Sequence, residues 1–368
     1  MDILNKIKTR FLTALAVAAV FVATSCAESL FDYETDCDVS HRIKFVYDMN
    51  LKWADAFPSE VKSVDLFVFD KNGLFVKQYD AAGEEIAQPG YSMLLDLPAD
   101  SYKFVAWCGL RNEGADEESF TVPQPVPGVT TIDQLTCTLN TKSSSEHAMY
   151  SDTELHFLYH GYLEATLVDN HDGQTYEHVI RLTKDTNHIR IILQELSSDE
   201  DMNPDHYGIR ILSANSKMAY NNDVQAVGQV TYLPWSKDAT EVGIGRVETD
   251  GEVKYIKGVV ADLSLARLMV DEAEAKAGKD KALMLVITDE TTLGPVKDEI
   301  ATIPLIDWAL MSKDYYEAAY KHRMTNQEML DREDEYIMTF FLVQGKWIES
   351  YIDILQWRIV KHNYDIGS

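Results

Sequence analysis

Cys26 is the residue whose neighbours define a chemistry most clearly. It follows three small residues, Ala23, Thr24 and Ser25. This order resembles a lipobox, in which the cysteine is diacylated and becomes the mature N-terminus. Two or more acyl chains hold a soluble protein on a membrane, because each buried methylene contributes about 0.8 kcal/mol. The sequence therefore predicts lipid attachment at Cys26. The position three before the cysteine is alanine where leucine is commonest, so a plain cleavage site with an incidental cysteine stays open.

The residues before Cys26 have the pattern of an export signal. Lys6, Lys8 and Arg10 form a basic start, and the run Phe11–Val22 is apolar apart from one threonine. A helix of this length spans about 18 Å, well short of the roughly 30 Å of a bilayer core. We therefore interpret residues 1–25 as a signal peptide that is removed, not as a transmembrane helix.

Histidines and carboxylates elsewhere offer weaker candidates for chemistry. His156 and His160 are four residues apart on a predicted strand, which places them about 13 Å apart. Cys37 and His41 form a single CxxxH, without the further cysteines and histidines that a zinc site needs. Neither pair predicts a metal site. The carboxylates of residues 331–335, namely Asp331, Glu333, Asp334 and Glu335, are interpreted as a solvated helix face.

No catalytic motif accompanies these residues. The sequence has no GxSxG elbow, no phosphate-binding loop ending in GK[ST], no HExxH and no GxGxxG after a strand. Asp70–Gly73 lacks the further carboxylates of a calcium loop and is interpreted as a hairpin turn. The sequence thus predicts no enzyme, catalytic residue, metal site, cofactor or small-molecule substrate.

The composition of the chain limits which classes of partner it can bind. Sixty Asp and Glu against 33 Lys and Arg give a net charge of −27, which repels nucleic acid. The apolar content of 46% supports a sizeable core. After the signal, Cys37, Cys108 and Cys137 remain; two of them could pair in an oxidising compartment, and the sequence does not say which.

Alternating apolar residues predict a mainly β chain. Ile43, Phe45 and Tyr47 begin this pattern, and it returns with the turn at Asp70–Gly73 and again after His178. Helices are predicted for residues 262–280, ending near Gly278, and for residues 304–324. The chain is predicted to close with a pair of strands, WIESYIDILQWRIV being the last alternating segment.

The order of these segments resembles a known family. A lipobox cysteine is followed by CDVSHRIKFVYDMNLKWADAFPSEVKSVDLFVFDKNGLFV and YSMLLDLPADSYKFVAWCGL, and the chain ends with MLDREDEYIMTFFLV and WIESYIDILQWRIV. In this order they resemble the minor fimbrium anchoring subunit family, which are lipoproteins at the base of donor-strand fimbriae in Gram-negative anaerobes. The likeness is specific over the first hundred or so mature residues and looser at the end.

The resemblance implies a fold and a role. It implies two transthyretin-like β-sandwich domains, residues 26–183 and 184–368, with a few short helices in the second. It implies lipid attachment at Cys26, a surface-exposed position on the outer membrane, and fimbrial shaft subunits as partners. The expected role is a non-enzymatic anchor that also limits the length of the shaft.

Two further expectations follow from the resemblance. Shaft subunits of such systems lose a first strand to an arginine-specific protease and donate a C-terminal strand. An anchor cut at Arg42 would lose Cys26, so Arg42 is predicted to stay intact. Residues Trp347–Val360 are predicted to pack in their own domain or to offer an edge to the next subunit.

Two rival functions stay open. The first is a polymerising or tip subunit of the same fimbriae. The second is a surface glycan-binding lipoprotein, since exposed tryptophans can stack on sugar rings. Five of the six tryptophans lie in contexts where core packing is more frequent; the six are Trp53, Trp107, Trp235, Trp308, Trp347 and Trp357.

Overall fold

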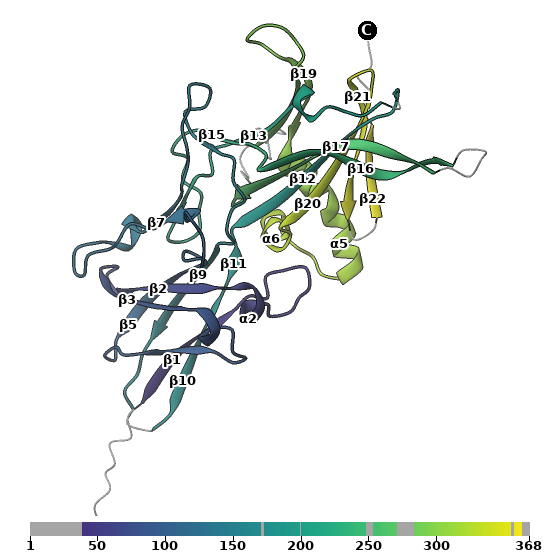
Figure 1. The fold of residues 1–368 in the computed structure, drawn as a ribbon. Helices are drawn as coiled ribbons and strands as arrows, with labels where there is room; N and C mark the ends of the chain where they lie inside the picture. The colour runs from purple at the N-terminus through teal and green to yellow at the C-terminus, as the bar shows by residue number, and fades with distance from the viewer. Residues whose placement is uncertain are drawn as a thin grey trace, which may run out of the picture.

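Strands dominate the protein, and helices are few and short (Figure 1). The computed structural model describes residues 39–170, 173–198, 200–247, 253–270, 283–354 and 357–362. The mainly β class predicted from the sequence is confirmed. Figure 1 shows two lobes, with β1 at one end of the molecule and β21 at the other.

The first lobe is a sandwich of two sheets. One has the strand order β10–β1–β4 and the other β11–β9–β5–β2–β3. The strands of this lobe are β1 (Ser40–Val46), β2 (Ser63–Asp70), β3 (Phe75–Ala82), β4 (Ser92–Leu95), β5 (Ser101–Cys108), β9 (Tyr159–Thr166), β10 (Thr175–Arg181) and β11 (Thr183–Lys184). The predicted alternation is confirmed, because Ile43 and Phe45 are buried between the sheets while the intervening residues are half-exposed.

Strand β2 of the five-stranded sheet is buried on both faces. Leu66 and Val68 of β2 pack into the first-lobe sandwich. Phe67 and Phe69 of the same strand point the other way, into the core of the rest of the molecule. Since successive side chains of a strand alternate between faces, a strand covered on both sides reads as continuously apolar, as β2 does.

The second lobe holds the larger sheets. Their strand orders are β16–β17–β12–β20–β21–β22 and β19–β18–β13–β15–β8, and a small sheet β14–β7–β6 lies beside them. The strands are β6 (Phe120–Thr121), β7 (Thr136–Leu139), β8 (Tyr150–Ser151), β12 (Thr186–Glu195), β13 (Tyr207–Ser213), β14 (Lys217–Ala219), β15 (Val230–Tyr232), β16 (Ser236–Val247), β17 (Val253–Ala266), β18 (Met284–Asp289), β19 (Asp298–Pro304), β20 (Glu335–Val343), β21 (Lys346–Ile354) and β22 (Trp357–His362).

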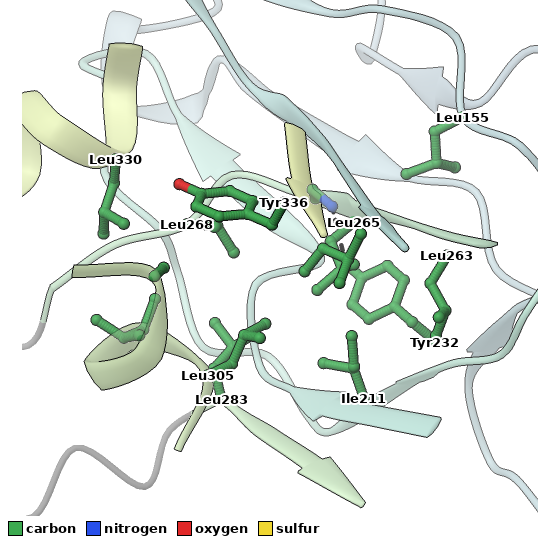
Figure 2. Close-up of a cluster of buried hydrophobic side chains, with 14 of the residues drawn as sticks. Leu155, Ile211, Tyr232, Leu263, Leu265, Leu268, Leu283, Leu305, Leu330 and Tyr336 are labelled. Carbon is green, nitrogen blue, oxygen red and sulfur yellow. Dashed lines mark hydrogen bonds between the residues drawn. The ribbon is translucent and has the colours of Figure 1, made fainter. Parts of the chain in front are cut away.

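Large aliphatic and aromatic side chains fill the core of this lobe. Figure 2 shows Leu263 and Leu265 of β17 beside Tyr232 of β15 and Ile211 of β13. The Tyr232 hydroxyl donates to Asn215 at 2.8 Å, so the buried phenol keeps a hydrogen-bond partner. These contacts join the six-stranded sheet to the five-stranded sheet.

Short helices cover the second lobe near its contact with the first lobe, which we call the seam. They are α4 (Leu305–Ala309), η4 (Leu310–Ser312), α5 (Lys313–Tyr320) and α6 (Asn326–Arg332); elsewhere lie α2 (Phe57–Glu60), η1 (Gly83–Glu85), η2 (Ile132–Gln134) and η3 (Pro204–His206). The helix predicted from residue 304 onward is confirmed. The helix predicted from residue 262 is wrong over Asp262–Ala266, which ends β17, and residues 271–280 lie outside the described residues.

The predicted hairpins are confirmed at both ends of the chain. β2 and β3 join through the turn at Asp70–Gly73, where Gly73 takes a φ of 80° that favours glycine. β21 and β22 form the predicted closing pair of strands.

The chain passes between the lobes more than once. Asp185 is the single residue between β11 of the first lobe and β12 of the second. Before that crossing, residues 120–151 already pair with strands that follow residue 216, through β7–β14 and β8–β15. The domain boundary after residue 183 remains a prediction.

Candidate assembly interface

The C-terminal strand β22 forms one edge of the six-stranded sheet. It pairs with β21 through six residue pairs, from Glu349–His362 to Ile354–Trp357. Among the strands that the structure describes, β22 has no neighbour on its other side. A free edge presents unpaired N–H and C=O groups to which an extended segment of another chain can add. Trp347–Val360 therefore packs in its own lobe and also ends in an edge.

The opposite edge of the same sheet is less regular. The pairing of β16 with β17 shifts register between Glu241 and Gly243 and again between Ile244 and Val247. Such bulges twist a strand and hinder pairing with another chain. The pairing of β22 with β21 has no shift. β22 is therefore the better candidate of the two for strand addition.

The first strand of the described chain fills the centre of the outer first-lobe sheet. β1 pairs in parallel with β10 over seven residues and antiparallel with β4 over four. Its Ile43 and Phe45 side chains are 0% and 1% exposed. Because both edges of β1 are paired, no space remains between β10 and β4 for a strand of another chain.

Arg42 is held inside this ladder. Its Nε donates to Ser92 Oγ and its Nη2 donates to the Ser92 carbonyl, both at 2.8 Å. Proteolysis requires local opening of the chain, and a central strand opens rarely.

We therefore predict that an arginine-specific protease cuts the native protein after Arg323, in the exposed segment between α5 and α6, at least about tenfold faster than after Arg42. Intact mass and N-terminal sequencing over a time course measure both rates. A first product that begins at Ile43 would contradict this prediction and favour a polymerising subunit.

A buried charge network fixes the crossing between the lobes. Asp185 is fully buried and accepts from Arg267 Nη1 at 2.9 Å and from Asn222 Nδ2 at 2.9 Å. Arg267 Nη2 lies 2.9 Å from Asp331. Burial raises the pKa of Asp185 to about 6, although the positive charge of Arg267 opposes this shift. Burial disfavours the charge of Arg267, but the two carboxylates outweigh it and raise its pKa.

Two further cations tie the second lobe to the first. Lys184 is buried, forms an ion pair with Asp334 and lies 3.9 Å from Glu60 at the end of α2. Arg332 of α6 donates to the backbone carbonyl of Asp48 at 3.1 Å. Charged hydrogen bonds of this kind are directional as well as strong. They set how the lobes meet.

The structure corrects the interpretation of residues 331–335 as a solvated helix face. Asp331 pairs with Arg267 and Asp334 pairs with Lys184. Glu333 accepts from the Tyr316 hydroxyl at 2.7 Å. Burial raises the pKa of Glu333 to about 7, with the nearby charge of Asp334 adding to the effect. Only Glu335 is exposed. The local sequence does not reveal these contacts, because the residues that pair with Asp331 and Asp334 lie far away along the chain.

His156 and His160, the two histidines considered above as possible metal ligands, have different hydrogen-bond partners. His160 lies on β9 and contacts the Tyr220 carbonyl at 2.7 Å, and burial lowers its pKa to about 3. His156 precedes that strand and contacts Ser119. Within the described residues, no group of three or more metal-ligating side chains comes together.

Two of the four cysteines, Cys108 and Cys137, lie in the described residues. Cys108 and Cys137 are free thiols buried in two different clusters, so they do not pair with each other. Burial raises the pKa of both thiols. Cys26, Cys37 and the signal peptide of residues 1–25 lie outside the described residues. The helices of the described part include none long and apolar enough to span a bilayer.

Sequence reasoning also missed residues at the seam. Arg267 lay in a predicted helix, and Trp53 was grouped with the other tryptophans. An alternation signal was available, since Ala261, Leu263 and Leu265 are buried on one face of β17. It would have placed Arg267 directly after a strand.

Comparison with known proteins identifies the family. A family model described as fimbrillin-A associated anchor proteins Mfa1 and Mfa2 matches residues 33–363. No curated protein matches the chain. The solved structure of a candidate adhesin from Bacteroides thetaiotaomicron is 30% identical, with a TM-score of 0.70, and the match covers 86% of this chain and 96% of that one.

Two more distant structures share the fold. A candidate polysaccharide-binding protein from Bacteroides thetaiotaomicron is 24% identical with a TM-score of 0.68, over 89% of this chain and 99% of that one. The fimbrial anchor protein Mfa2 from Porphyromonas gingivalis is 17% identical with a TM-score of 0.58, over 89% of this chain and all of that one. The family expected from the order of the sequence segments is confirmed: the chain belongs to the fimbrillin-A associated anchor proteins.

Proposed function

We propose that this protein anchors a fimbrial shaft to the cell surface and limits its length at the base. The family is structural rather than catalytic and is associated with fimbriae at the cell surface. In the proposal, lipid on Cys26 holds the protein in the outer membrane and β22 receives an extended segment of the first shaft subunit.

The observation that carries the proposal is the contrast between the two ends of the molecule. β1 fills the outer first-lobe sheet, and that strand lies only fourteen residues after Cys26 (40 − 26 = 14). β22 at the far end has a free, regular edge. Other outer strands, such as β10 and β4, also have an unpaired side within the described part of the chain, so the contrast lies in the groove: a subunit whose outer first-lobe sheet is already filled by β1 takes no donor strand there, which suits the last position of a polymer.

Two variants expressed in cells that lack the wild-type protein test the proposal. Cys26→Ala is expected to move the protein from the membrane fraction to the soluble fraction, with long fimbriae shed into the medium. Deletion of residues 357–368, which removes β22, is expected to leave the protein in the membrane fraction while the shaft is still shed. Fractionation and electron microscopy measure both results.

Cys108→Ala is the matched control, because its thiol is buried in the first-lobe core. We expect this variant to keep both the protein and the fimbriae on the cell. Cell-bound fimbriae of unchanged length in both the Cys26→Ala and the β22-deletion cells would remove the anchor proposal. Release of the protein with sheared wild-type fimbriae would favour a shaft or tip subunit.

A further inference from the structure

An exposed tryptophan stands at the seam between the lobes, away from β22. Trp53 is 36% exposed, in a loop that precedes α2. Asn50 braces this loop: its Nδ2 donates to the carbonyls of Tyr47 and Ala54, and its Oδ1 accepts from the backbone N–H of Lys52. The loop is therefore rigid, and it presents its largest apolar side chain to solvent.

Both segments that meet here have strained backbones. Trp53 has a φ of 52°, and Lys321, just after α5, has a φ of 54°. Only two other non-glycine residues in the described chain, Asn222 and Gln344, have positive φ. Residues other than glycine adopt this region at a cost of about 1 kcal/mol or more, and such strain tends to persist at sites that bind or react.

Side chains of the second lobe fix the orientation of the indole. The Arg332 guanidinium lies 3.8 Å from the centre of the Trp53 ring. Arg332 is itself held by Glu328 at 3.0 Å. His322 approaches the indole edge-on with 4.7 Å between ring centres. The ring is thus preorganised, so a ligand that stacks on it need not immobilise a side chain.

A second exposed aromatic ring extends this surface. Tyr320 is 38% exposed, and its ring centre lies 6.0 Å from that of Trp53. It stacks on Tyr316, with 6.1 Å between ring centres and 12° between ring planes. Figure 1 shows that α5, which carries Tyr320, lies on the side of the second lobe that faces α2. Each lobe therefore contributes one ring.

An open hollow of about 470 Å³ adjoins the rings. It is lined by Asp314, Glu317, Ala318, Lys321, His322 and Arg323. Two carboxylates, Asp314 and Glu317, supply acceptors, and Lys321 and Arg323 supply donors, which suits a ligand whose hydroxyl groups both donate and accept hydrogen bonds. A net charge of −27 disfavours a polyanion.

We propose that this surface, the Trp53–Tyr320 platform, binds a neutral carbohydrate. The apolar C–H face of a pyranose ring would pack on the exposed indole and phenol, and its hydroxyls would reach the charged side chains of the hollow. This function goes beyond anchoring, and neither Cys26 nor β22 takes part in it.

The test uses the full mature chain and defined probes. Neutral trisaccharides of mannose, glucose, galactose and N-acetylglucosamine are titrated to about 10 mM, with calorimetry and saturation-transfer NMR as readouts. We expect at least one probe to bind. Trp53→Ala is expected to weaken that binding by at least about tenfold, and Tyr320→Ala by about fivefold.

Two controls keep the result interpretable. Phe157→Ala removes another exposed aromatic ring, 50% exposed, whose centre lies 3.5 Å from Lys184 Nζ in a different part of the contact between the lobes. With a melting temperature close to that of the wild type, this variant should bind as the wild type does. Trp53→Ala could loosen the seam through Arg332, so Tyr320→Ala with an unchanged melting temperature decides in that case. The proposal is overturned if no probe binds the wild type, or if Tyr320→Ala binds as tightly as the wild type.

Discussion

Replacing Arg267 with methionine is expected to lower the free energy of unfolding by about 3–5 kcal/mol. The guanidinium is the shared partner of two carboxylates, the fully buried Asp185 and the partly buried Asp331. Methionine has a similar length but no charge, so the variant leaves both acids in an apolar seam without a cation. The burial that already raises the pKa of Asp185 to about 6 would then be opposed, among the contacts described above, only by the hydrogen bond from Asn222.

Urea unfolding followed by circular dichroism measures this loss. Arg181→Met is the matched control: Arg181 also pairs with an aspartate, Asp48, but its side chain is 64% exposed, so a change within about 1 kcal/mol is expected. Adding Asp185→Asn to Arg267→Met removes one of the two carboxylates that have lost their cation, and should restore part of the stability. Equal losses for Arg267→Met and Arg181→Met would refute a structural role for the network.

The contribution of Glu333 to stability is also expected to fall as the pH rises from 4.5 to 7. Burial raises the pKa of this carboxyl from 4.5 to about 7, so the folded protein holds its proton more tightly than the unfolded chain does. The resulting stability is fully present below pH 4.5 and is lost as the pH passes about 7. The difference corresponds to about 3 kcal/mol.

Glu333→Gln isolates this contribution. The amide keeps the shape of the neutral acid and cannot ionise, so the stability of the variant relative to the wild type should increase between pH 4.5 and 7, and the variant should be more stable than the wild type above pH 7. Glu335→Gln, two residues away and exposed, serves as the control and should follow the wild-type curve. Parallel curves for Glu333→Gln and the wild type would show that the carboxyl is already ionised in the fold.

The parts of the fold predicted from the sequence are those that depend on local pattern. Alternation at Ile43 and Phe45 and the turn at Asp70–Gly73 report directly on one strand and one hairpin. The stretch after Asp262 fits a helix as well as a strand, because Leu265, Leu268 and Met269 recur at the i, i+3, i+4 spacing of a helix face while Leu263 and Leu265 alternate as in a strand. Pairing with β12 decides in favour of a strand, and that contact lies more than sixty residues away.

The candidate site was less predictable for the same reason. Nothing local at Asp331 reveals that Arg267 lies beside it, and nothing at Asp334 reveals Lys184. Counting acids in a strongly acidic chain favours a solvated face, yet folding brings the few buried cations to these carboxylates. Alternation within WIESYIDILQWRIV predicts strands at β21 and β22, whereas the expectation of an edge there comes from the family resemblance and not from the pattern.

The position of β1 determines how the protein would respond to tension. β1 lies between β10 and β4, and its ladder pairs run side by side along its length. A pull applied along the axis of β1 would shear its ladder pairs with β10 and β4 together rather than unzip them one at a time. In the proposed anchor, the three-stranded sheet β10–β1–β4 would therefore resist drag on the attached filament as one unit.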